Sequence, residues 1–363
     1  MTEIKMKKEK VFIYDLSIIM SSTRNNSGVL TYETAVLERI MEFSTQKNIK
    51  IILLVKDKAT IKKIKKNKFV KVNELKNKKY EYLYILLNHF ECVRSFIYKH
   101  DLNIIERHIK AKEYYFLSPN RMALAISSPN IISTFWDFGH RQLKNDPEVS
   151  SIFNWIRREY FYSKVTRKSK LIITDSKKTS KLMEKYYGIS NKKIRISGLP
   201  LPKRLECKTK NKKIIRLAEE KYIIYPATNW HHKNHKFLFK IIKKMTEDGT
   251  NLRLILCGPR LRNGININGM IQEFKLQNYV VDLEFIKDSE KYFLIKNAAL
   301  LIMPTKLGPT NYPIFEAAKL GTRSIISNVH DFESVSHIAD QVTIVSNWEI
   351  SNWSHKIEKY YNE

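Results

Sequence analysis

The residues best suited to bind a phosphate lie in the segment PTKLGPTNYPIFEAAKLG, residues 304–321. An apolar run precedes it, Gly308 marks a turn, and a helix is predicted to begin near residues 311–313 and to end at Gly321. A strand, a glycine turn and a helix N-terminus together present free backbone N–H groups and a positive dipole end, which can hold a diphosphate without a metal ion. Glu316, about one turn into the helix, is then placed to accept hydrogen bonds from ribose hydroxyls. The pattern also fits an ordinary strand–loop–helix connection with an exposed glutamate.

A second strand, polar loop and helix is predicted in KYIIYPATNWHHKNHKFLFKIIKKM, residues 221–245. Lys233 lies near the start of that helix, where its ammonium group can neutralise a phosphate as a point charge. His231 and His235 have the i, i+4 spacing of a metal-binding pair, but the glutamate of HExxH is absent and no further ligand is evident. Packing of these histidines in the loop is therefore favoured over a metal site.

Two further segments carry candidate residues. Asp137, His140 and Arg141 follow the apolar run IISTF, and strand ends are the usual location of chemistry in open α/β sheets. The Asp-x-x-His spacing is equally compatible with a structural hydrogen bond. Gly28 is predicted to lie in the turn after the first strand and to open a helix, without the GxGxxG pattern of a nicotinamide-binding fold.

The elements that position these residues are short β-branched runs separated by longer amphipathic stretches, which predict parallel α/β units. The predicted strands lie within residues 10–19, 49–56, 131–138, 170–176, 192–198, 221–228, 252–259, 280–287, 298–305, 322–328 and 340–346. A segment rich in proline and lysine, residues 199–215, is the predicted linker. We therefore expect two doubly wound, Rossmann-like domains, residues 1–200 and 201–345, and a final helix within residues 346–363.

Length and composition agree with this division. A chain of 363 residues exceeds what one hydrophobic core usually organises. The three cysteines lack metal-ligand spacing, and no apolar run approaches the about 20 residues that span a bilayer, so we expect a cytoplasmic protein. The net charge of +29 predicts attraction to polyanions. Because the lysine clusters are scattered and not interleaved with aromatic residues, solvated basic faces and peripheral membrane association are favoured over specific nucleic-acid binding.

Taken together, the segments resemble glycosyltransferase family 4 in order and spacing along nearly the whole chain. Residues 308–317 are similar to the donor-loop pattern GPTNxPxxEA, and residues 230–235 to the WxHKNH segment. Residues 136–141, followed by PEV, resemble the WDLxHR-type segment of bacterial surface-polysaccharide transferases. ITDS at residues 173–176, with the later YGI, resembles the end of the family's N-terminal domain.

The resemblance implies a GT-B fold, in which the C-terminal domain holds a sugar nucleotide, the N-terminal domain holds the acceptor, and the last helix commonly returns to the N-terminal domain. Lys233 would contact the diphosphate, Glu316 the ribose, and the amides near Thr310 the phosphate or sugar. The predicted catalytic residues are Asp137, His140 and Lys233. The predicted donor-binding residues are Gly28, Asn229, Lys233, Arg260, Gly308, Thr310, Asn311 and Glu316.

Three positions depart from the usual family pattern. Gly308 stands where the first glutamate of E-x7-E contacts donor-sugar hydroxyls. Trp136 stands where a histidine often precedes the aspartate, so His140 becomes the candidate in its place. Thr228 and Asn229 occupy the neighbourhood of an arginine that often precedes the diphosphate-binding lysine. Arg260 or Arg262 is expected to assist Lys233 instead.

The function implied by the resemblance is retaining, metal-independent sugar transfer from a UDP- or GDP-sugar to a lipid-linked surface glycan such as O-antigen, capsule or lipopolysaccharide. The expected location is the inner face of an anionic membrane, and no cofactor is expected. Two alternatives remain open. A catalytically inactive transferase-like scaffold would fit Gly308 and Trp136, and a basic nucleic-acid-binding protein would fit the net charge of +29.

Overall fold

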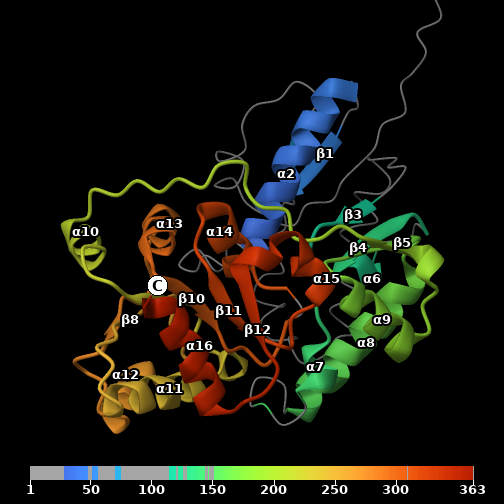
Figure 1. Ribbon diagram of the computed structural model, residues 1–363. Helices are drawn as coiled ribbons and strands as arrows, with labels where there is room; N and C mark the ends of the chain where they lie inside the picture. Colours follow the sequence, from blue (N-terminus) through green and yellow to red (C-terminus); the bar gives the residue numbers. More distant parts are fainter. Residues whose placement is uncertain are drawn as a thin grey trace, which may run out of the picture.

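The computed structural model describes residues 28–47, 51–55, 70–74, 114–119, 122–125, 129–143, 146, 151–308 and 310–362. Within these ranges every strand pairing is parallel, and the two larger sheets belong to two α/β domains (Figure 1). The predicted fold class is therefore confirmed. The predicted strand within residues 10–19 and the PEV segment at residues 147–149 lie outside the described residues.

The N-terminal domain contains a four-stranded sheet in the order β3-β4-β5-β6. Its strands are β3 (Tyr114–Phe116), β4 (Ile131–Phe135), β5 (Leu171–Thr174) and β6 (Ile194–Ile196). Its helices are α2 (Gly28–Lys47), α6 (Met122–Ala125), α7 (Gly139–Gln142), α8 (Ile152–Lys168), α9 (Lys177–Tyr187) and the 3-10 helix η2 (Asn191–Lys193). A separate pair joins β1 (Ile51–Val55) to β2 (Val70–Glu74).

The C-terminal domain contains a six-stranded sheet in the order β12-β11-β10-β7-β8-β9. The strands are β7 (Ile223–Pro226), β8 (Leu254–Cys257), β9 (Val280–Asp282), β10 (Leu300–Met303), β11 (Ser324–Ser327) and β12 (Val342–Val345). The helices are α10 (Lys212–Leu217), η3 (His231–Lys233), α11 (His235–Glu247), α12 (Ile267–Glu273), α13 (Asp288–Asn297), α14 (Tyr312–Leu320), α15 (Phe332–Val335), η4 (Ser336–Gln341) and α16 (Ile350–Asn362). Each predicted apolar run in this half contains one of these strands.

The strand order places a topological switch point between β7 and β10. From β7 the chain steps outward to β8 and β9, then returns to the other side of β7 with β10 and continues to β11 and β12. The connections after β7 and β10 therefore leave the carboxyl edge of the sheet in opposite directions. This opening is where open α/β sheets bind ligands.

The C-terminal core includes the last helix. β7, β8, β10 and β11 are buried along their whole lengths, which explains the apolar runs of the first three and the two isoleucines between Ser324 and Ser327 in β11. Trp353 of α16 is fully buried and packs edge-on against Phe237 of α11, with ring centroids 5.7 Å apart. The Tyr361 hydroxyl donates a hydrogen bond of 2.9 Å to the Lys221 carbonyl. The helix expected to return to the N-terminal domain thus packs on the C-terminal one.

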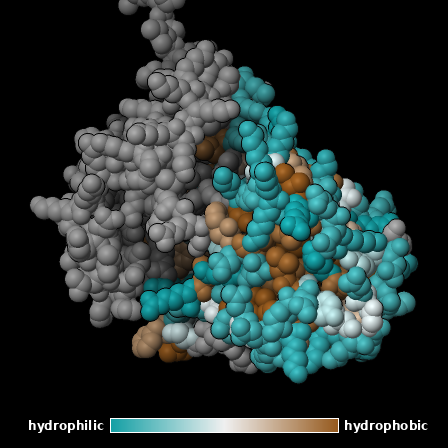
Figure 2. All heavy atoms as spheres, turned by 90° about the vertical axis from the view of Figure 1, so that its left-hand side faces the viewer, coloured by the Kyte–Doolittle hydropathy of each residue, from teal (hydrophilic) through white to brown (hydrophobic). Residues whose placement is uncertain are grey.

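A connection without helix or strand, residues 197–211, joins the two domains and passes along one edge of the molecule to α10 (Figure 1). α10 begins at Lys212, inside the predicted linker. The face that carries α10, α12 and α13 is mostly hydrophilic, with hydrophobic residues gathered in a band at its middle (Figure 2). None of the described helices has the length and apolar character required to cross a bilayer.

Candidate active site

A cavity of about 580 Å³ lies between the two domains at the switch point. The C-terminal domain lines it with the connections after β7 and β10 and with residues of α13 and α14. The N-terminal domain contributes the first residues of α2, the connection after β4, Arg158 of α8, and Asp175 after β5. Seven predicted site residues line this cavity: Gly28, Asp137, Lys233, Gly308, Thr310, Asn311 and Glu316.

Lys233 reaches the loop after β10 from the loop after β7. Its ammonium group donates a hydrogen bond of 2.9 Å to the side-chain oxygen of Asn311. The backbone behind it is fixed, because the buried Tyr225 hydroxyl donates to the Lys233 carbonyl at 2.6 Å. The Lys306 N–H donates to the His232 carbonyl at 2.8 Å, which ties the two loops together. The adjacency of β7 and β10 thus places a cation beside the start of α14.

The N-terminus of α14 faces the cavity without a side-chain cap. Asn311 occupies the N-cap position, but its side chain accepts no hydrogen bond from the helix amides. Its amide nitrogen instead lies 3.2 Å from the Gly308 carbonyl oxygen and 3.0 Å from Nε2 of His330. Pro313 lies in the first turn and Gly321 ends the helix in the left-handed conformation, as predicted. The first turn of α14 therefore presents its amides and positive dipole end to an anion.

Gly308 has a backbone conformation that favours glycine. Its φ is +98°, and a Cβ atom built there would lie 3.2 Å from the Asn311 side-chain nitrogen and 3.4 Å from the Thr310 carbonyl oxygen. A glutamate would be strained in this loop. The departure from the E-x7-E pattern is thus accompanied by a backbone that suits glycine at this position.

Glu316 uses one of its two carboxylate oxygens in a buried ion pair. Its Oε1 atom accepts a hydrogen bond of 3.0 Å from the Lys291 ammonium group. Burial alone lowers the pKa of Lys291, but the adjacent Glu316 carboxylate raises it above the ordinary value, so the lysine stays charged. The Oε2 atom of the fully buried Glu316 has no hydrogen-bond partner among the described residues. Because a buried unpaired carboxylate oxygen is costly, this atom is a candidate acceptor for a ligand hydroxyl.

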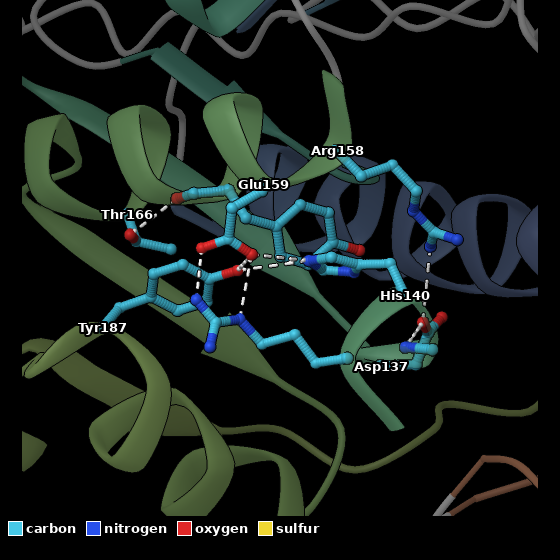
Figure 3. Close-up of polar contacts among 9 residues, drawn as sticks. Asp137, His140, Arg158, Glu159, Thr166 and Tyr187 are labelled. Atoms are coloured by element: carbon cyan, nitrogen blue, oxygen red, sulfur yellow. Dashed lines mark hydrogen bonds and ion pairs between the residues drawn. The ribbon is translucent and has the colours of Figure 1, made fainter. Parts of the chain in front are cut away.

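Arg158 lines the cavity from the N-terminal domain and was not among the predicted site residues. Its guanidinium group lies 3.5 Å from Oδ1 of Asp137, and the same oxygen accepts a 2.8 Å hydrogen bond from the Gly139 N–H (Figure 3). Asp137 therefore orients an arginine of α8 toward the site. No local motif marks Arg158, because its position depends on how α8 packs beside α7.

His140 lies behind Asp137 and does not line the cavity. It is fully buried, and its Nε2 atom is 3.2 Å from a Glu159 carboxylate oxygen and 3.3 Å from the Tyr187 hydroxyl (Figure 3). Glu159 also pairs with Arg141. Burial, followed by the Arg158 charge, lowers the pKa of His140 to about 4. This arrangement supports the segment that carries Asp137 and offers no direct contact with a ligand in the cavity.

Asp175 belongs to the ITDS segment of the resemblance but was not among the predicted site residues. It follows β5, lines the cavity, and accepts a hydrogen bond from the Thr310 hydroxyl of the C-terminal domain. Burial raises the pKa of its carboxyl group to about 7. The two domains thus meet at a titratable group beside the loop after β10.

Asn229 and Arg260 are turned away from the cavity. The buried Asn229 side chain accepts from the Leu261 N–H at 2.7 Å and donates to the Leu261 and Ile265 carbonyls. Arg260 forms a two-pronged ion pair with Asp282 and donates to the Ala227 and Gly258 carbonyls. Both side chains hold the loop after β8 in place, while Arg262 is exposed.

The histidines after β7 were weighed as metal ligands or as loop-packing residues, and His235 packs in the core. His235 is fully buried and packs on Tyr225 with ring centroids 5.0 Å apart, and neither of its ring nitrogens has a hydrogen-bond partner among the described residues. Burial lowers its pKa to about 3. Within the part of the chain that the structure describes, no three His, Cys, Asp or Glu side chains are grouped to hold a metal ion.

A larger cavity, of about 980 Å³, shares Tyr32, Asp175, Leu199 and Thr310 with the candidate site. Its lining is mainly apolar and comes from α2, residues 196–201 and the C-terminal domain, including α14 and residues 331–338. It includes neither Lys233 nor Glu316. The smaller cavity therefore contains the candidate phosphate- and hydroxyl-binding groups, Lys233 and Glu316.

Comparison with known proteins agrees with this geometry. Residues 208–363 match the family model described as glycosyl transferases group 1. No curated protein matched the sequence. The solved structure of WaaG, a glycosyltransferase involved in lipopolysaccharide biosynthesis, is similar with a TM-score of 0.65 and 12% identity over 97% of this chain and 90% of that one.

Two further solved structures share the architecture. Sucrose-phosphate synthase from Thermosynechococcus elongatus has a TM-score of 0.70 and 11% identity, over 98% of this chain and 90% of that one. HepE of Anabaena in complex with UDP-glucose has a TM-score of 0.64 and 13% identity, over 96% of this chain and 89% of that one. The family match over residues 208–363 supports a role in glycosyl transfer. Residues 208–363 thus match the group 1 glycosyl transferases, within a chain whose two parallel-sheet domains have the GT-B glycosyltransferase fold.

Proposed function

We propose that this protein transfers a sugar from a nucleoside-diphosphate sugar to a glycan acceptor, with retention at the anomeric carbon and without a metal ion. One observation carries the proposal: Lys233, the uncapped N-terminus of α14 and the unpartnered Oε2 of Glu316 meet in one cavity at the switch point. These groups suit a diphosphate and a ribose. UDP is the proposed nucleotide, because a solved GT-B relative, HepE, was crystallised with UDP-glucose.

In the proposed reaction, the bond between the anomeric carbon and the diphosphate oxygen breaks while the acceptor oxygen attacks from the same face. The departing phosphate oxygen takes the acceptor proton, so no pair of protein carboxylates is needed. Negative charge grows on the leaving diphosphate. Lys233, the amides of α14 and Arg158 are the groups that stabilise this charge, and fixed charges of this kind act most strongly in a site that excludes water.

The proposed acceptor is a lipid-linked surface glycan, such as O-antigen, capsule or lipopolysaccharide, at the inner face of the membrane. Two structural relatives, WaaG and WaaB, are lipopolysaccharide glycosyltransferases. The net charge of +29 supports association with an anionic surface. Asp137, which orients Arg158, is proposed to act from the acceptor side of the cavity.

Calorimetry with UDP- and GDP-sugars, with and without a chelator, tests the donor site. We expect saturable binding of one nucleotide that the chelator leaves unchanged, and a donor screen with linkage determination then identifies the product. Absence of sugar-nucleotide binding together with steeply salt-dependent binding to DNA or RNA would favour a nucleic-acid-binding protein. Donor binding without transfer to any acceptor would favour an inactive scaffold.

A further inference from the structure

The outer side of α8 exposes an unusual group of large hydrophobic side chains. Ile152 is 61% exposed, Phe153 80%, Ile156 53% and Tyr160 46%. They make up four of the nine exposed large hydrophobic residues in the described part of the chain. Phe153, Ile156 and Tyr160 follow a spacing of three and four residues, so they lie on one face of the helix. The opposite side of α8 packs into the N-terminal core, which holds this face outward.

Positive charges continue the same face toward the C-terminal end of the helix. Lys164 and Arg167 follow Tyr160 at the same helical spacing, and both are exposed. The Lys164 ammonium nitrogen lies 5.8 Å from the centroid of the Tyr160 ring. The single acidic residue of α8, Glu159, is engaged by Arg141. We call Phe153, Ile156, Tyr160, Lys164 and Arg167 the α8 outer face.

The α8 outer face, hydrophobic at its start and positively charged toward its end, has the chemistry of a membrane interface. Phenylalanine and isoleucine gain free energy by leaving water for the acyl boundary, and tyrosine favours the headgroup level. Lysine and arginine are attracted to anionic headgroups, each contributing about 1 kcal/mol near such a surface. A second copy of this chain is a poorer occupant, because each copy carries a net charge of +29.

We propose that the α8 outer face docks on an anionic membrane surface. The proposal rests on the proposed function, since it identifies the contact through which the enzyme reaches a lipid-linked acceptor. Arg158 belongs to the same helix and lines the candidate site. A helix is about 10 Å across with its side chains, so a docked α8 brings the cavity close to the headgroups.

Flotation of the full-length chain with vesicles of equal parts phosphatidylcholine and phosphatidylglycerol tests the hydrophobic part of this face. We expect the protein to float with these vesicles and to remain unbound with phosphatidylcholine alone. The double variant Phe153→Ser/Ile156→Ser should lower the partition coefficient at least about tenfold. Ile215→Ser, which removes an exposed isoleucine from α10, is the matched control and should float like the wild type.

The charged part is tested by the double variant Lys164→Glu/Arg167→Glu. Its partition coefficient should also fall at least about tenfold, since two attractive charges become repulsive. Lys236→Glu/Lys240→Glu on α11 changes the net charge equally, at two exposed lysines far along the chain. That control should retain most of the binding. Equal losses in both charge variants would assign the binding to overall charge and overturn the role of α8.

Other results also overturn the proposal: no flotation of the wild type with anionic vesicles, or wild-type flotation by Phe153→Ser/Ile156→Ser. If that variant abolishes a dimer while flotation is unchanged, the face is a self-association surface. None of the outer-face side chains lines the candidate site, so sugar-nucleotide binding should be unchanged in all variants. A wild type that floats as expected but binds no sugar nucleotide would contradict the proposed function and leave the docking surface intact.

Discussion

The Thr310 hydroxyl donates a hydrogen bond across the domain boundary to the buried carboxyl group of Asp175. Thr310 directly precedes Asn311, whose side-chain oxygen accepts from Lys233. Nearby, the Lys178 N–H at the start of α9 donates to Asp331 at 3.0 Å. The position of the N-terminal domain is thus coupled to the loop that holds the proposed diphosphate site.

Asp175→Asn should change how stability depends on pH. Burial raises the pKa of Asp175 from 3.8 to about 7, so the folded chain holds a proton here that the unfolded chain has lost. This group therefore makes the free energy of unfolding fall as pH rises through that window. Asparagine does not titrate. We expect the difference between the melting temperatures of the variant and the wild type to shift in favour of the variant from about pH 5 to about pH 8. A difference that is constant over this range would show that Asp175 does not titrate there.

Lys233→Ala should lower the catalytic rate of transfer by about 100-fold or more, because it removes a fixed charge beside the leaving diphosphate. Steady-state kinetics and nucleotide calorimetry measure the effect. Lys236→Ala removes an exposed lysine of α11, three residues further along the chain, and serves as the control. Near-normal turnover of Lys233→Ala would reject the assigned phosphate site.

Glu316→Ala should lower transfer by orders of magnitude and also destabilise the fold. The change leaves the buried Lys291 cation without its partner, and breaking a buried pair in this way costs about 3–5 kcal/mol. The double variant Glu316→Gln/Lys291→Met removes both charges. It should recover much of the melting temperature without recovering sugar-nucleotide binding. Recovery of both would mean that Glu316 has only a structural role.

Arg158→Ala should lower the catalytic rate about tenfold or more while changing nucleotide affinity less, because Arg158 approaches from the opposite domain and acts on the growing charge. Arg158→Lys should recover part of the rate. Arg157→Ala, at the neighbouring position of α8, controls for loss of an arginine from this helix. Unchanged kinetics in Arg158→Ala would remove this residue from the site.

Gly308→Glu should weaken donor binding although it reconstructs the E-x7-E pattern. The φ of +98° disfavours any side chain, with a cost of about 1 kcal/mol or more, and the new Cβ would crowd Asn311. Gly308→Ala separates backbone strain from the added carboxylate and should show most of the same loss. Tighter donor binding by the glutamate variant would contradict the strained geometry.

Local sequence determined the strands and several helix ends. The apolar runs at residues 223–226 and 300–303 form strands because their side chains are buried on both faces of a central parallel sheet. Ser176 and Gly188 enclose α9 as its N-cap and C-cap. β2 and β3 were missed, because one carries lysine and glutamate and the other has only three residues. Such signals act within a few neighbouring residues, so they can be read without the fold.

Side-chain direction depended on tertiary structure. Lys233, Asn311 and Glu316 were predicted together, and the adjacency of β7 and β10 brings them to one cavity. Asn229 and Arg260 have equally suitable chemistry, yet they face the loop after β8, where buried backbone groups require partners. Arg158 and Asp175 enter the site from the N-terminal domain. In the sequence, the hydrophobic residues of the α8 outer face resemble core positions, but in the structure the opposite side of α8 packs into the core. The sequence alone thus established the fold class and the segments that contain the site. Which side chains face the cavity, the core or the surface depends on packing between segments far apart in the chain, and only the tertiary structure decided it.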